Sequence, residues 1–193
     1  MPRTKCFKEE EVLKKAMELF WKKGYHATSI QDLVDFLGIN RASLYDTFGG
    51  KKVLFEKAFA LYRDTNTHLT RQFLAKEANT KEGFLKLFTI AVQQIIEDKD
   101  NKGCFVVNTT TEMLPLDKSL KKTLSANKAT FEDIFYQYLQ KGEQEGQIKK
   151  GKNLKAIAQM LFTVYNGLKV VGKTQQKEEA LMPAVHAALS VLD

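Results

Sequence analysis

The scarcity of helix-breaking residues, combined with apolar side chains at helical spacing, is what most constrains this chain. Proline occurs three times in 193 residues, at positions 2, 115 and 183, and no segment shows the alternation of β-branched and polar residues that is typical of strands. Residues 9–23 illustrate the pattern, because one helical face collects Val12, Leu13, Ala16, Leu19 and Phe20. The sequence therefore predicts an all-α fold of about nine helices.

The predicted helices fall into two unequal groups. The first, residues 1–62, is predicted to contain helices near 9–23, 30–37 and 41–47 and the start of a long helix at Lys51. The second, residues 63–193, is predicted to contain helices near 81–98, 104–114, 116–145, 153–172 and 176–192. Because the boundary falls inside the long helix, which is predicted to end near residue 73, we expect the two domains to communicate mechanically.

Residues 29–48 have the pattern of a helix-turn-helix. Two capping boxes precede the first helix, one beginning at Thr28 and one at Ser29, and the sequence leaves both open. Gly38 suits the positive φ of a tight turn, and Asn40 suits the N-cap of the next helix. Two short helices joined by a glycine turn are typical of a DNA-binding motif.

The second helix of this motif suits the major groove of DNA. Its outer face, near the N-terminus, offers the small or hydrogen-bonding side chains that fit a groove about 12 Å wide, namely Asn40, Arg41, Ala42 and Ser43. Leu44 and Phe48 lie on the opposite face and are predicted to be core residues. Arg41 can read a guanine edge or bind a phosphate, and the sequence leaves both roles open.

Residues 24–55 resemble the N-terminal domain of the TetR family of transcriptional regulators. The resemblance rests on an ordered set of features, among them Tyr25, the Thr28-Ser29 cap, Asp32, Gly38-Ile39, Tyr45, Phe48 and Lys51. It implies phosphate contacts from Tyr45 and Lys51, further contacts from Thr28, Ser29 and Gln31, and a flexible arm carrying Arg3 and Lys5. Asp46 departs from the family pattern, because phosphate repels a carboxylate at that position.

The same resemblance implies the rest of the architecture. A three-helix helix-turn-helix DNA-binding domain is joined to a larger helical domain that dimerises through the last two helices and binds a small-molecule effector. Those two helices are apolar on more than one face, and a two-fold axis suits a palindromic operator in double-stranded DNA. The candidate effector site mixes aromatic and polar side chains: Phe88, Cys104, Asn108, Thr111, Phe131, Phe135, Tyr138, Tyr165 and Lys169.

Cys104 has two possible roles. It follows Gly103 at a predicted helix N-terminus, where the helix dipole favours a reactive thiolate. Together with Lys173, this arrangement is similar to that of a TetR-type repressor that senses electrophiles and oxidants. The other interpretation is a small buried apolar residue.

Composition narrows the remaining classes of function. The net charge is +7, but residues 1–62 contribute only +3 (11 Lys and Arg against 8 Asp and Glu), so charge supports nucleic-acid binding weakly. The chain lacks a secretory signal, an apolar run of membrane-spanning length, and Cys or His spacings that bind metals. We therefore expect a cytoplasmic regulator without membrane, metal or cofactor. An effector-independent DNA-binding protein or an activator is the alternative, and an enzyme is disfavoured because His26, His68 and His186 are scattered.

Overall fold

The computed structural model describes residues 7–193, and every regular element in that range is helical. The elements are α1 (Glu9–Lys23), α2 (Ile30–Leu37), α3 (Arg41–Phe48), α4 (Lys51–Lys76), α5 (Thr80–Glu97), α6 (Phe105–Glu112), α7 (Leu120–Gln144), α8 (Leu154–Val171), α9 (Glu178–Leu189) and the 3₁₀ helix η1 (Ser190–Leu192). The predicted all-α fold is confirmed for this part of the chain. Arg3, Lys5 and Cys6 lie outside the described residues.

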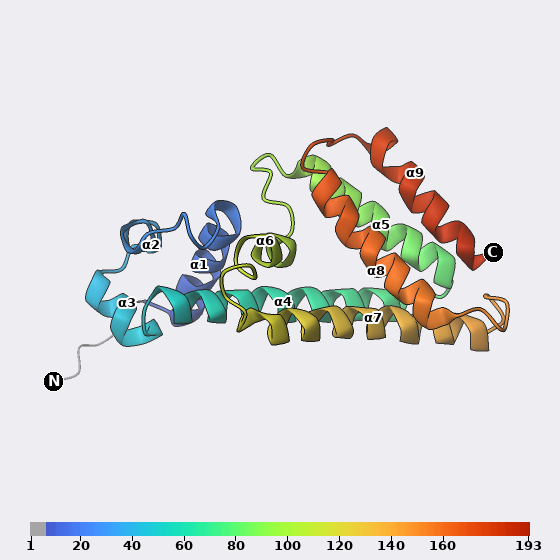
Figure 1. The fold of residues 1–193 in the computed structure, drawn as a ribbon, viewed down its shortest axis with the longest axis horizontal. Helices are drawn as coiled ribbons and strands as arrows, with labels where there is room; N and C mark the ends of the chain where they lie inside the picture. Colours follow the sequence, from blue (N-terminus) through green and yellow to red (C-terminus); the bar gives the residue numbers. More distant parts are fainter. Residues whose placement is uncertain (1–6) are drawn as a thin grey trace.

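The molecule is elongated, with α1, α2 and α3 at one end and α5, α8 and α9 at the other (Figure 1). Helices α4 and α7 run lengthwise along one side, and α6 lies between the two ends (Figure 1). Within residues 7–193, no helix is both long and apolar enough to span a membrane.

The helix-turn-helix is formed by local capping interactions. Ser29 begins α2, because its hydroxyl accepts a hydrogen bond from Asp32 N while the Asp32 carboxylate accepts one from Ser29 N. Gly38 ends α2 with φ of 68°, a left-handed conformation that glycine adopts without a steric penalty. Asn40 Oδ1 then accepts from Ser43 N at 2.8 Å and begins α3.

Helices α6 and α7 differ from the predicted bounds. The sequence predicts helices near 104–114 and 116–145, whereas α6 ends at Glu112 and α7 begins at Leu120. The intervening residues form turns, in which the Asp117 carboxylate accepts hydrogen bonds from the backbone N–H and the hydroxyl of Ser119. Local hydrogen bonds of this kind compete with helix formation, which explains the shorter helices.

Two hydrophobic cores stabilise the fold, and α4 contributes to both. The first core contains residues of α1–α3 together with Leu54, Phe55 and Phe59 of α4. The second core lies among α5, α7, α8 and α9 and includes Leu74 at the far end of α4. The 26-residue α4 therefore connects the two ends directly, because it packs as one continuous helix through both cores.

Phe105 joins α6 to the first core, although α6 follows α5 in the chain. Its side chain is buried, and its ring contacts the rings of Phe55, Phe59 and Tyr62 at centroid distances of 5.7, 5.3 and 5.5 Å. Edge-on contacts of this kind add to the free energy of burial. Packing thus places α6 against the helix-turn-helix end of the molecule.

We expect Phe105→Ala to lower the free energy of unfolding by about 3–5 kcal/mol, because the substitution removes a buried ring and leaves a cavity. Urea denaturation followed by circular dichroism measures this loss. Leu116→Ala is the control, because Leu116 is 75% exposed and its truncation should cost less than about 0.5 kcal/mol. Equal stability of Phe105→Ala and the wild type would contradict the role assigned to this ring.

Candidate DNA interface and effector cavity

The outer face of α3 is a polar surface at one end of the molecule. Asn40, Arg41 and Ala42 are exposed, Ser43 is half-buried, and Tyr45 and Asp46 are exposed one turn further on. The inner face packs into the first core through Leu44 and Phe48, which are buried as the sequence predicts. Arg41 lies along the Tyr45 ring, with 5.9 Å between its guanidinium carbon and the ring centroid.

Residues of α2 and its cap differ in how far they reach this surface. Ser29 and Gln31 are exposed, and the Gln31 amide donates to Asp35 at 2.8 Å. Thr28 is fully buried, and its hydroxyl donates to the carbonyl of Gly24 at 2.6 Å. Its side chain therefore lies beneath the surface and supports the turn before α2.

Lys51 lies at the N-terminus of α4, next to the α1–α2 turn. Its Nζ is 4.3 Å from the centre of the Tyr25 ring, which is a cation–π distance. Burial lowers the pKa of Lys51, while the nearby Glu112 and Asp32 carboxylates act in the opposite direction. The ammonium is held at the start of a helix, where backbone N–H groups also favour an anion.

A small cavity of about 20 Å³, which we call the inner cavity, lies where α4, α7 and α8 meet the start of α6. It is lined by Tyr62, Arg63, Asn66, Cys104, Val106, Asn127, Phe131, Phe162, Tyr165, Asn166 and Lys169. A larger cavity of about 480 Å³, the outer cavity, adjoins it, because Tyr62, Asn66 and Lys169 line both. Trp21 of α1, α5 and residues 97–103 complete the outer cavity.

The structure brings four of the nine predicted effector residues to the inner cavity: Cys104, Phe131, Tyr165 and Lys169. Phe88 and Phe135 lie in the second core, and Tyr138 donates from its hydroxyl to the carbonyl of Asn79 at 3.0 Å. Thr111 is exposed and donates to carbonyls of its own helix. Asn108 lies outside both cavities, where its Oδ1 accepts from Lys173 at 3.0 Å.

Sequence reasoning missed the contribution of α4 to this cavity, and that of Asn127 on α7. Tyr62, Arg63 and Asn66 of α4 lie one, three or four residues apart and thus share one side of the helix. Asn127 interrupts the buried face that α7 otherwise builds from residues such as Leu124 and Phe131. The amide of Asn127, alone on an otherwise apolar helical face, was the signal in the sequence that could have indicated a cavity here.

Cys104 is 5% exposed and is the N-cap of α6. The Tyr62 hydroxyl lies 3.9 Å from its Sγ as a donor, and burial together with Cys104 raises the pKa of Tyr62 well above its ordinary value. Lys169 places its Nζ 3.9 Å from the centre of the Tyr165 ring. Burial acts to lower the pKa of Lys169, but interactions with Tyr165 and Cys104 raise it overall, so the side chain carries its charge at neutral pH.

Two family descriptions match this chain. "Bacterial regulatory proteins, tetR family" covers residues 12–58, and "Tetracyclin repressor-like, C-terminal domain" covers residues 85–188, which is more than half of the chain. The chain belongs to the TetR family of transcriptional regulators. The resemblance identified in the sequence is confirmed, and membership of a family of regulators excludes the enzyme alternative.

Relatives of this TetR-family chain match it over nearly its full length. The uncharacterised HTH-type transcriptional regulator YezE of Bacillus subtilis is 31% identical, and the match covers 100% of this chain and 100% of YezE. The HTH-type transcriptional repressor ComR of Escherichia coli is 30% identical, and the match covers 93% of this chain and 86% of ComR. A cysteine mutant of the regulator CifR, solved with 26 bp operator DNA, has a TM-score of 0.88 at 27% identity, covering 99% of this chain and 100% of CifR.

Direct contacts connect α6 and its flanking loops to the DNA-binding end of this TetR-family protein. Glu112, the last residue of α6, accepts hydrogen bonds from two consecutive backbone N–H groups of the α1–α2 turn, Tyr25 N at 3.2 Å and His26 N at 2.7 Å. We call this group the Glu112 clamp. A carboxylate at a helix C-terminus is disfavoured by the helix dipole, so the two hydrogen bonds offset a local cost.

Gly24 lies beside this clamp, at a position that only glycine fits. Its φ of 84° disfavours other residues, and a Cβ there would lie 2.8 Å from the Glu112 carboxylate. Lys51 stacks on the ring of Tyr25, so the clamp reaches the candidate DNA surface through one side chain. A shift of α6 therefore moves the groups that surround Lys51.

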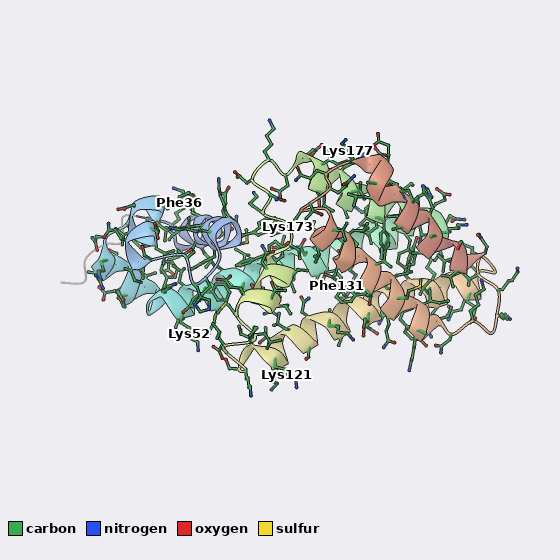
Figure 2. All side chains as sticks on the ribbon, turned by 45° about the horizontal axis from the view of Figure 1, so that its top comes forward. Phe36, Lys52, Lys121, Phe131, Lys173 and Lys177 are labelled. Atoms are coloured by element: carbon green, nitrogen blue, oxygen red, sulfur yellow. The ribbon has the colours of Figure 1, made fainter. Side chains whose placement is uncertain are left out.

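Three further contacts bridge the same two parts. The indole N–H of Trp21 donates to the carbonyl of Gly103 at 3.0 Å. Lys22 pairs with Asp100 at 2.7 Å. Lys52 of α4 pairs with Asp117 at 3.1 Å. Figure 2 labels Lys52, and it labels Lys121 near the start of α7. The ion pairs are exposed and contribute little free energy each, so the clamp and the Phe105 contact dominate the connection.

We expect Glu112→Ala to accelerate amide hydrogen exchange at Tyr25 and His26 by roughly tenfold or more, because hydrogen bonds to a charged group contribute about 1.5–3 kcal/mol. Glu112→Gln should give an intermediate effect, since its single carbonyl oxygen replaces two carboxylate oxygens. Exchange followed by mass spectrometry or NMR measures both. Glu56→Ala, an exposed carboxylate on α4, is the matched control. Unchanged exchange in Glu112→Ala would show that the clamp does not hold the turn.

Proposed function

We propose that this TetR-family regulator is a homodimeric repressor that binds a palindromic operator and releases it when an effector enters the C-terminal domain. The exposed N-terminus of α3, rigidly joined through α4 to the wall of the inner cavity, is the observation that carries the proposal. The relatives ComR and BdcR of Escherichia coli are named as transcriptional repressors, and CifR was solved with operator DNA. A cytoplasmic location follows from the proposed DNA target.

We assign the contacts with bases to the exposed residues at the N-terminus of α3. We assign the contacts with phosphates to the residues around them. Asn40, Arg41, Ala42 and Ser43 face outward at the end of the helix that enters the groove in such motifs. Tyr45 and Lys51 are placed to contact phosphates, with Ser29 and Gln31 beside them. Thr28 supports these residues from beneath, because its hydroxyl is occupied by Gly24.

The last two helices are assigned the dimer interface. Their outward side is apolar and exposed, with Val170 and Val171 at 52% and 54% exposure and small residues along α9 that include Ala180, Ala184 and Ala187. Burial of such a face against a second copy gives a two-fold axis, which matches the symmetry of a palindrome.

The operator experiment tests this function. We expect two chains to bind one short palindrome from the DNA beside the gene, much more tightly than random DNA at moderate salt. Tyr45→Phe and Lys51→Ala should weaken binding on every sequence, whereas Arg41→Ala should relax discrimination at one base pair by about 1–3 kcal/mol. Fluorescence anisotropy and sedimentation measure affinity and stoichiometry.

Each contrary outcome of that experiment has a separate meaning. Uniform affinity for all DNA would favour the effector-independent DNA-binding protein. Equal loss in Arg41→Ala on every operator variant would assign Arg41 to the backbone instead of a base. Tight binding that switches a promoter on in a transcription assay would identify an activator.

In one version of the effector proposal, the effector is an electrophile that reacts with Cys104. The Cys104 Sγ would add to a ring carbon of benzoquinone, forming a C–S bond while the thiol proton passes to the reduced ring, so no other oxidant is needed. Because Cys104 is buried beside the inner cavity, only small reagents reach it.

We expect benzoquinone to release operator DNA from the wild type and from Cys6→Ser, but not from Cys104→Ser. Anisotropy measures release, and mass spectrometry of the intact protein identifies the adduct. Release from Cys104→Ser equal to that of the wild type would remove Cys104 from the mechanism and leave its role as a small buried apolar residue.

A further inference from the structure

The inner cavity holds two cationic side chains and no acidic one. Arg63 of α4 and Lys169 of α8 both line it, and none of its other lining residues is Asp or Glu. Neither cation takes part in an ion pair with another residue in the range 7–193. Both side chains are half-buried, and positive charge that is partly withdrawn from water without a counter-charge favours the binding of an anion.

Aromatic rings compensate these charges only in part. The guanidinium carbon of Arg63 lies 5.2 Å from the centre of the Phe59 ring, and Lys169 Nζ lies 3.9 Å from that of Tyr165. Both are cation–π contacts, in which the ring faces the cation but supplies no carboxylate. Arg63 Nε is buried and has no hydrogen-bond partner within the described chain.

Asn127 adds a neutral donor without a partner. It is 7% exposed, lies on the buried face of α7 and lines the inner cavity. No hydrogen bond joins its amide to another described residue, in contrast to Asn66 and Asn166, whose amides donate to carbonyls of their own helices. An amide that lines a cavity and makes no hydrogen bond within the described residues is a donor that a ligand can use.

We propose that the inner cavity binds the carboxylate of a small organic acid through Arg63, Lys169 and Asn127, and that the body of the acid extends into the outer cavity. This assignment rests on the proposed function, since it names the chemical class of the effector. A carboxylate has the acceptor oxygens that these donors lack, and guanidinium groups bind it in bidentate geometry.

The sizes and walls of the two cavities fit this division. About 20 Å³ in the inner cavity is comparable to the space of a single water, which suits a small polar group. About 480 Å³ in the outer cavity is the size of a small-molecule site, where Trp21 and Ile95 supply apolar surface beside charged residues that include Glu97, Asp98 and Lys102. Tyr62 and Lys169 line both cavities and lie where head and body of the ligand join.

The three proposed ligand-binding residues come from three different helices. Arg63 lies on α4, Asn127 on α7 and Lys169 on α8. A carboxylate bound by all three brings one negative charge to the two cations and draws the helices together. Because α4 begins at Lys51 beside the candidate DNA surface, a displacement of α4 reaches the operator contacts without any reaction at Cys104.

Calorimetry and thermal denaturation of the full chain, without DNA, test the site. The probes are acetate, butyrate, benzoate and phenylacetate, each paired with its uncharged amide. We expect at least one acid to bind at least about tenfold more tightly than its amide, because only the acid brings a negative charge to the two cations. Lys169→Met and Asn127→Leu should reduce that affinity at least about tenfold. Lys173→Met is the matched control, because Lys173 pairs with Asn108 outside the cavity.

A stability measurement separates loss of the site from loss of the fold. Ligand-free Lys169→Met should keep the helical content and the cooperative unfolding of the wild type, because the side chain makes no ion pair within residues 7–193 and methionine keeps most of its volume. Equal binding of acids and amides, failure of every acid to bind, or tighter binding of sulfate and phosphate than of every acid would overturn the assignment.

An operator-binding arm distinguishes this inference from the proposed function. Operator binding by the wild type, combined with failure of every acid, overturns the carboxylate site and leaves the repressor proposal standing. Lys169-dependent binding of an acid without any change in operator affinity confirms the site and overturns its role as the effector site.

Discussion

The packing of Phe105 against Phe55, Phe59 and Tyr62 is the interaction on which the rest of the structure depends. It places α6 against a continuous α4 and brings a loop-linked segment of the C-terminal domain into the core of the helix-turn-helix. The Glu112 clamp can form only because this ring contact sets the position of α6. Both ends of the molecule are therefore joined by direct packing contacts.

Charge is distributed in two different ways along this unit. On the surface, lysines such as Lys22 and Lys52 pair with carboxylates in water, where the pairs contribute little. In the inner cavity, Arg63 and Lys169 face aromatic rings and have no carboxylate. Cations without a carboxylate partner are what a binding site for an anion requires.

The DNA-binding half could be predicted in detail because its signals are local. Gly38, Asn40 and the alternation of inward Leu44 with outward Arg41 follow from turn and cap chemistry within a few residues. The sequence could not decide whether Thr28 or Ser29 caps α2, because each residue fits the capping-box motif. The choice was decided by burial of Thr28 against Gly24, a contact of the folded turn.

The sequence by itself determined the all-helical fold, the helix-turn-helix and the family, since helical periodicity and capping act over short distances along the chain. Only the tertiary structure decided which side chains share a cavity. Phe88, Phe135 and Cys104 have similar apolar character in sequence, yet the first two lie in a core and the third beside Arg63 and Lys169. The physical reason is that a cavity is formed by the crossing of α4, α7 and α8, and the positions of these crossings depend on long-range packing that no single segment encodes.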